Sequence, residues 1–118
     1  MTSFHNEYDK LSADWNLELT MAIYTRGSPY TSAEMDEIST TFDQLVLNLR
    51  NIFATSFNIN LWDARLNRML AHCHYFISGL IGTILQARPR ASFLLPTLHI
   101  YFAALYASCV TAYFCPAE

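Results

Sequence analysis

The feature that most constrains the fold is a long apolar stretch with helical spacing between residues 60 and 85. Apolar side chains recur there every three or four residues, which is the period of an α-helix. They are Trp62, Leu66, Met69, Leu70, Cys73, Phe76, Ile77, Leu80, Ile81 and Ile84. Asn60 is a suitable N-cap, and no side chain from 76 to 85 is charged. Because a helix that is apolar all round is normally buried, this stretch predicts a central buried hydrophobic helix.

Two glycines, Gly79 and Gly82, lie inside this predicted helix. Each is less favourable than alanine in a helix interior by about 1 kcal/mol. Their presence predicts that another helix crosses closely at this point.

Three further helices are indicated, with breaks between them. The first spans 4–25 and ends at the Gly27-Ser28-Pro29 break, and the second spans about 33–54. Thr31 and Glu34 have the spacing of a capping box before the second helix. The central helix should end at Ala87, before Arg88-Pro89.

The last helix should begin between Ser92 and Thr97, with Pro96 in its first turn, and run to about Phe114. No segment alternates with the period of a β-strand. Residues 1–118 therefore predict a single all-α domain, a compact helical bundle around the central buried helix.

Composition points toward binding. Hydrophobic residues make up 53% of the 118 residues and charged residues 14%, against an ordinary charged share of about 25%. Such a chain carries more apolar surface than a monomer hides, which indicates a partner, self-association or a membrane. The net charge is −3, with one lysine and six arginines in no basic stripe, so nucleic-acid binding is not expected.

The cysteines and the first residues indicate a cytoplasmic protein. The three cysteines, Cys73, Cys109 and Cys115, have no disulfide-framework spacing, which suits a reducing compartment. The first residues lack the basic and apolar segments of a secretory signal.

The uncharged segment 93–114 allows two interpretations. It is 22 residues long and follows Arg88 and Arg90, so it has the length and flanks of a membrane anchor. It also contains Pro96, His99 and several hydroxyl side chains, and without it the central helix would lack covering segments. We favour a packed or interface helix and keep the anchor as the alternative.

No cluster of residues indicates catalysis, a metal or a cofactor. His72 and His74 are two positions apart, so on a helix they point in nearly opposite directions and cannot share a metal ion. Cys73 lies on the apolar stripe and should pack as a small hydrophobe. Glycine-rich phosphate loops and nucleophile elbows are absent from the sequence. We therefore predict a protein that is not an enzyme.

Two passages, and more faintly a third, resemble the Bcl-2 family of apoptosis regulators. Residues 41–49 are similar to the helix that lines one wall of the family's binding groove. Residues 60–66 resemble the Asn-Trp-Gly-Arg motif that opens the family's central helix, and 11–19 resemble, more faintly, its second helix. The motif differs here, because Asp63-Ala64 replaces the glycine and adds one residue before Arg65. The family's C-terminal Gly-Trp motif is absent, so the resemblance is to a divergent, viral-type member.

The resemblance implies an apoptosis inhibitor that sequesters the amphipathic death-motif helix of pro-apoptotic Bcl-2 family proteins in a hydrophobic groove. It would act in the host-cell cytoplasm or at the mitochondrial outer membrane. Arg65 would meet an aspartate of the ligand. The partner-binding residues would be Arg65, Asn60, Trp62, Leu45, Leu49, Leu66, Met69, Leu17 and Met21. The alternative is a self-associating helical structural protein or a tail-anchored viral protein, and a homodimer is compatible with either function.

Overall fold

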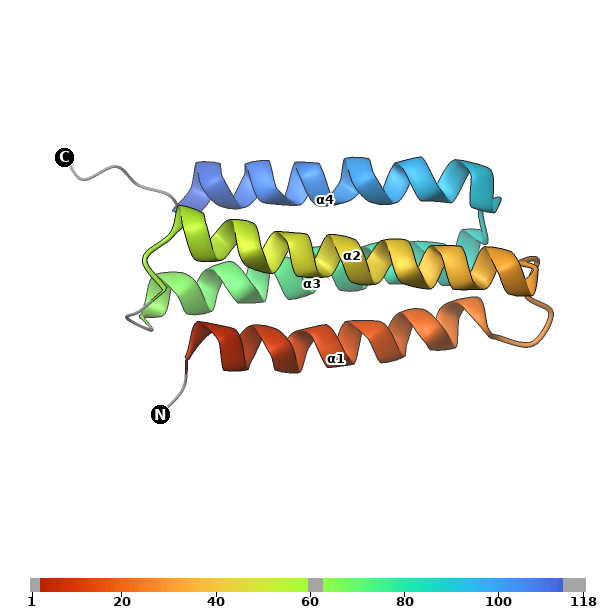
Figure 1. Ribbon diagram of the computed structural model, residues 1–118, viewed down its shortest axis with the longest axis horizontal. Helices are drawn as coiled ribbons and strands as arrows, with labels where there is room; N and C mark the ends of the chain where they lie inside the picture. The colour runs from red at the N-terminus through yellow and green to blue at the C-terminus, as the bar shows by residue number, and fades with distance from the viewer. Residues whose placement is uncertain (1–2, 60–62, 114–118) are drawn as a thin grey trace.

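The computed structural model describes residues 3–59 and 63–113, which form four long α-helices (Figure 1). These are α1 (Phe4–Ile23), α2 (Ser32–Ser56), α3 (Ala64–Ala87) and α4 (Ala91–Tyr113). Successive helices run in opposite directions along a body of 51 × 27 × 20 Å. The described residues contain no β-strand, so the prediction of an all-α protein is confirmed.

The helices occupy the four corners of the bundle in an order that differs from the order in the sequence. In the described residues, α1 packs against α2 and α3, and α4 packs against the same two helices. The pairs α1/α4 and α2/α3 therefore lie on the diagonals. As a consequence, α1 and α3 are parallel neighbours, and so are α2 and α4 (Figure 1).

The expectation that α3 is a central helix enclosed on all sides is not confirmed. It is one corner of the bundle and buries a single stripe, with Tyr75 85% exposed and Leu85 46% exposed. Its buried residues are Leu66, Met69, Leu70, Cys73, Ile77, Leu80, Ile81 and Ile84. The uncharged second half is not apolar all round, because Gly79, Gly82 and Thr83 form part of its outer side. Four helices with one apolar stripe each share a core along the bundle axis and need no helix at the centre.

The expected close crossing at the two glycines is wrong. A Cβ atom added at Gly79 or at Gly82 would meet no atom within 4 Å. Open space, rather than a neighbouring backbone, adjoins both positions.

Gly79→Ala and Gly82→Ala are therefore each expected to stabilise the protein by up to about 1 kcal/mol. Alanine fits without a clash and removes the conformational freedom that glycine loses on folding. Urea denaturation followed by circular dichroism measures the change. A lower free energy of unfolding in either variant would contradict the open surroundings of these two residues.

Local capping fixes the helix starts. Thr31 Oγ1 accepts a hydrogen bond from Glu34 N at 3.1 Å, and Glu34 Oε1 accepts one from Thr31 N at 2.9 Å, so the predicted capping box is confirmed. The N-cap of α3 is Asp63, whose Oδ1 accepts from Leu66 N at 3.0 Å. It replaces the predicted cap Asn60, which lies outside the described residues.

The start of α4 also differs from expectation. The helix begins at Ala91, so Pro96 lies inside it rather than in its first turn. Pro96 has no N–H to donate to the carbonyl of Ser92. Both residues are exposed, so that carbonyl lies on the solvent side of the helix. Thr97 Oγ1 donates to the neighbouring Phe93 carbonyl at 2.8 Å.

Of the described helices, α4 alone has the length and apolar composition that crossing a membrane requires. One face of it nevertheless packs into the bundle. The buried residues of this face are Ala91, Leu94, Leu98, Phe102, Leu105 and Cys109.

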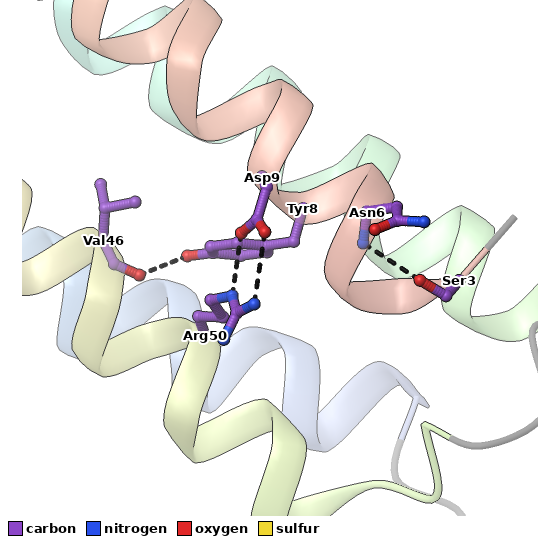
Figure 2. Close-up of polar contacts among 6 residues, drawn as sticks. All are labelled: Ser3, Asn6, Tyr8, Asp9, Val46 and Arg50. Atoms are coloured by element: carbon purple, nitrogen blue, oxygen red, sulfur yellow. Dashed lines mark hydrogen bonds and ion pairs between the residues drawn. The ribbon is translucent and has the colours of Figure 1, made fainter.

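Specific contacts tie α1 to the rest of the bundle. The buried Tyr8 hydroxyl donates to the Val46 carbonyl at 2.6 Å, and Arg50 makes a two-pronged contact with Asp9 at 2.9 and 3.3 Å (Figure 2). These contacts join α1 to α2. Figure 2 also shows Asn6 N donating to the Ser3 hydroxyl, the N-cap of α1.

Candidate functional site

Three of the predicted partner-binding residues belong to the core. Leu49 is 2% exposed, and Leu66 and Met69 are fully buried. The physical reason is the diagonal placement of α2 and α3, whose apolar stripes face the bundle axis instead of bordering a surface groove. In this arrangement the three side chains are not accessible to a partner helix.

Arg65 and Leu45 lie apart from each other. Arg65 is half-buried in the first turn of α3, and its Nε is buried with no hydrogen-bond partner in the described part of the chain. Leu45 is half-buried beside a hollow of about 190 Å³ between α2 and α4. Asn60 and Trp62 lie outside the described residues. The structure therefore does not place Arg65 and Leu45 in the single groove that the resemblance implies.

Among the predicted residues that the structure describes, Leu17 and Met21 are the most exposed. They lie one turn apart on α1, at 62% and 66% exposure. Met21 borders a groove of about 430 Å³ between α1 and α3, which we call the α1–α3 groove. Its lining residues are Glu18, Met21, Ala22, Thr25, Ser78, Ile81, Gly82 and Leu85.

The α1–α3 groove exists because small residues face each other where the two helices meet. Ala22 and Gly82 leave a hollow whose floor includes Ala22 and Ile81, at 4% and 5% exposure. The exposed side chains of Met21 and Leu85 border it from α1 and α3. Glu18 contributes the only charged side chain among the lining residues.

Two hydrogen bonds fix the register of α1 on α3, one near the middle of the two helices and one just beyond their C-terminal ends. Trp15 Nε1 donates to His74 Nδ1 at 2.9 Å, and Arg88 Nη1 donates to the Gly27 carbonyl at 3.1 Å. By this register Met21 lies level with about residue 81 of α3. Arg65 is 16 residues before that level, or about 24 Å at 1.5 Å per residue. The arginine and the groove therefore occupy different ends of α3.

The sequence contains a signal for this groove, but the signal has another meaning than the one predicted. Gly82 inside an apolar helix predicts a close helix crossing, whereas in the structure it leaves an unfilled space. Leu85 and Ser78 were not identified, because periodicity alone does not show which helix packs beside them.

The two histidines point to opposite sides of α3, as predicted. His74 accepts from Trp15 of α1, whereas His72 Nε2 lies 3.1 Å from the Ser108 hydroxyl of α4. The Tyr113 hydroxyl lies 3.5 Å from His72 Nδ1. The described residues contain no group of three or more His, Cys, Asp or Glu side chains that could hold a metal ion.

Two cysteines meet in the core between α3 and α4. The Sγ atoms of Cys73 and Cys109 are 3.7 Å apart, and both side chains are fully buried, which confirms the prediction that Cys73 packs as a small hydrophobe. The pKa of Cys73 is raised by its contact with Cys109 and by burial. Either thiol can be the donor in this contact.

The chain matches no model of a protein family, no curated protein and no solved structure. These comparisons assign it to no family.

Proposed function

We propose that this chain is a non-enzymatic binding protein that holds an amphipathic helix of a partner in the α1–α3 groove. The partner class implied by the resemblance is the death-motif helix of pro-apoptotic Bcl-2 family proteins, which would make the chain an apoptosis inhibitor. The observation that supports binding at this place is the apolar floor of the groove between the exposed side chains of Met21 and Leu85.

An amphipathic helix binds a groove through apolar side chains one turn apart. Leu17 and Met21 provide a row of the same spacing on α1, and Gly82 leaves room for a side chain of the ligand. Each apolar anchor buried contributes about 1.5–3 kcal/mol before the costs of ordering. Methionine is flexible and adapts to ligands of different shape. Glu18 favours a lysine or arginine on the ligand beside its anchors.

The test compares the affinity of a variant in which a side chain fills the groove with that of a matched variant substituted outside the groove. Gly82→Leu places a side chain in the hollow, and we expect it to weaken binding of a fluorescently labelled death-motif peptide at least tenfold. Gly79→Leu makes the same change on the same helix, at a position that also has open space but does not line the groove. It should leave the affinity unchanged.

Fluorescence anisotropy titrations give both dissociation constants, and circular dichroism verifies that both variants are folded. Equal affinities for the two leucine variants would exclude the α1–α3 groove as the binding site. Arg65→Ala in the same titration reports whether the ligand also reaches the first turn of α3, as the resemblance implies.

A second candidate function is that of a self-associating structural or tail-anchored protein. The outer side of α4 favours it, because Phe93 and Ile100 are 66% and 67% exposed on a helix without a charged residue. Association that grows with protein concentration in detergent-free buffer would support self-association. A requirement for detergent or vesicles would support the anchor.

A further inference from the structure

The outer side of α4 is uncharged along its whole length. The helix has 23 residues, none of them Asp, Glu, Lys or Arg. The residues opposite its buried stripe, which we call the α4 outer face, are Phe93, Pro96, Ile100, Ala103, Ala104, Ala107 and Thr111. All seven are exposed, and they recur with the three-four spacing of one helix face.

The absence of charge on the α4 outer face indicates which kind of partner can bind there: a charged helix, an anionic membrane surface or a second copy of the chain. A charged partner helix would lose hydration against this face and gain no counter-charge. An anionic membrane surface attracts rows of basic side chains, whereas no such row follows α4 in the described residues: Arg88 and Arg90 precede the helix, and Arg68 of α3 lies beside Ser108 and Tyr113 near its other end. A second copy of the chain brings an equally uncharged face, so no charge is desolvated when the two meet.

The sizes of the side chains make the α4 outer face complementary to itself in one orientation. The large residue Phe93 is seven positions before Ile100, and the small residue Ala107 is seven positions after it. Each lies about 10.5 Å from Ile100 along the helix. When two copies pair antiparallel about Ile100, each Phe93 lies over the Ala107 of the other copy, and Pro96 lies over Ala104.

A parallel pair would not have this complementarity. It would set Phe93 against Phe93 and Ala107 against Ala107, with crowding at one end and a void at the other. We infer that two copies of this chain associate through antiparallel contact of their α4 outer faces, with Ile100 at the two-fold axis. This contact is isologous, so it closes a dimer and does not extend into a filament.

The area of the α4 outer face alone is too small for a stable dimer interface, so the residues beside α4 must also be buried in the dimer. A helix of 23 residues is about 35 Å long and presents a stripe about 10 Å wide, or about 350 Å² per copy. A stable interface buries about 800 Å² per partner. Apolar surface flanks the stripe on both sides, at Ile52 of α2 and at Tyr75 and Phe76 of α3. The dimer contact should therefore extend over these neighbouring residues.

This inference rests on the second candidate function and not on the α1–α3 groove, so the two can fail separately. Sedimentation velocity of the full chain over a hundredfold range of concentration, without detergent, should show a monomer–dimer equilibrium. Ile100→Glu places two like charges face to face at the two-fold axis and should raise the dissociation constant of the dimer at least tenfold. Tyr24→Glu introduces the same charge at an exposed site just after α1, outside both the α1–α3 groove and the α4 outer face, and should leave dimerisation unchanged.

Cysteine cross-linking tests the orientation. In a Cys115→Ser background, an oxidised mixture of Phe93→Cys and Ala107→Cys chains should yield the mixed disulfide dimer, identified by mass spectrometry. A disulfide dimer of Phe93→Cys with itself would instead indicate a parallel pair and overturn the proposal. A wild-type chain that is monomeric throughout, an Ile100→Glu chain that dimerises normally, or association only with vesicles would each overturn it as well.

Discussion

Replacing Trp15 with alanine is expected to lower the free energy of unfolding by about 3–5 kcal/mol. Trp15 is fully buried between α1 and α3. Its ring packs edge-on against Tyr8 and stacks on His74, with centroid distances of 5.7 and 6.3 Å. Its Nε1 also donates the hydrogen bond to His74. Because domains of this size are stable by only about 5–15 kcal/mol, this one substitution removes a large share of the stability.

Two further variants separate ring packing from hydrogen bonding. Trp15→Phe retains an aromatic ring but loses the indole N–H, and should destabilise the protein less than alanine does. Leu17→Ala, on the exposed side of the same helix, should change stability by no more than about 0.5 kcal/mol. Urea denaturation monitored by circular dichroism gives all three values. A loss for Trp15→Ala no larger than for Leu17→Ala would mean that Trp15 does not hold α1 to α3.

The second large effect is expected at alkaline pH. Burial raises the pKa of the Tyr8 hydroxyl far above its ordinary value of 10, and the neighbouring Cys73 and Asp9 raise it further, while Arg50 opposes them. Above pH 10 the unfolded chain therefore releases a proton that the folded chain retains. The stabilisation associated with neutral Tyr8 is fully present below pH 10 and falls by about 1.4 kcal/mol per pH unit above it. At pH 12 the loss should reach roughly 2–3 kcal/mol.

Urea denaturation at a series of pH values from 8 to 12 measures this dependence. Tyr8→Phe should be destabilised at neutral pH by about 1 kcal/mol, because the bond to the Val46 carbonyl is lost. It should also lose stability less steeply above pH 10. Tyr24→Phe removes an exposed tyrosine and serves as the control, with the wild-type slope. Identical alkaline slopes in the wild type and Tyr8→Phe would show that Tyr8 does not retain its proton.

The helices could be predicted from the sequence because the signals for them are local. Thr31 and Glu34 cap α2 over three residues, and Arg88-Pro89 ends α3 where expected. The position of Pro96 inside α4 could not be predicted from the sequence. The free energy that a proline costs inside a helix depends on whether the carbonyl left without a donor, here that of Ser92, faces solvent, and this depends on the tertiary packing. Periodicity correctly indicated that apolar side chains would be buried, but it did not indicate which helices would be neighbours.

The candidate site was predictable only in part for the same reason. Leu17 and Met21 were predicted as partner-binding residues from the resemblance, and both are accessible in the structure, at 62% and 66% exposure. Leu49, Leu66 and Met69 belong to regular apolar stripes, and their burial follows from the diagonal placement of α2 and α3. That placement depends on contacts between residues distant in sequence, which a single sequence does not reveal.

The diagonal placement also divides the molecule into two helical hairpins, α1 with α2 and α3 with α4, which dock face to face. The interface between the hairpins consists of the two parallel helix pairs, α1 with α3 and α2 with α4. The α1–α3 groove lies along the first of these pairs. A ligand bound in the groove would contact both hairpins at once. Because it would bind only while the hairpins are docked, its binding would raise the free energy needed to separate them.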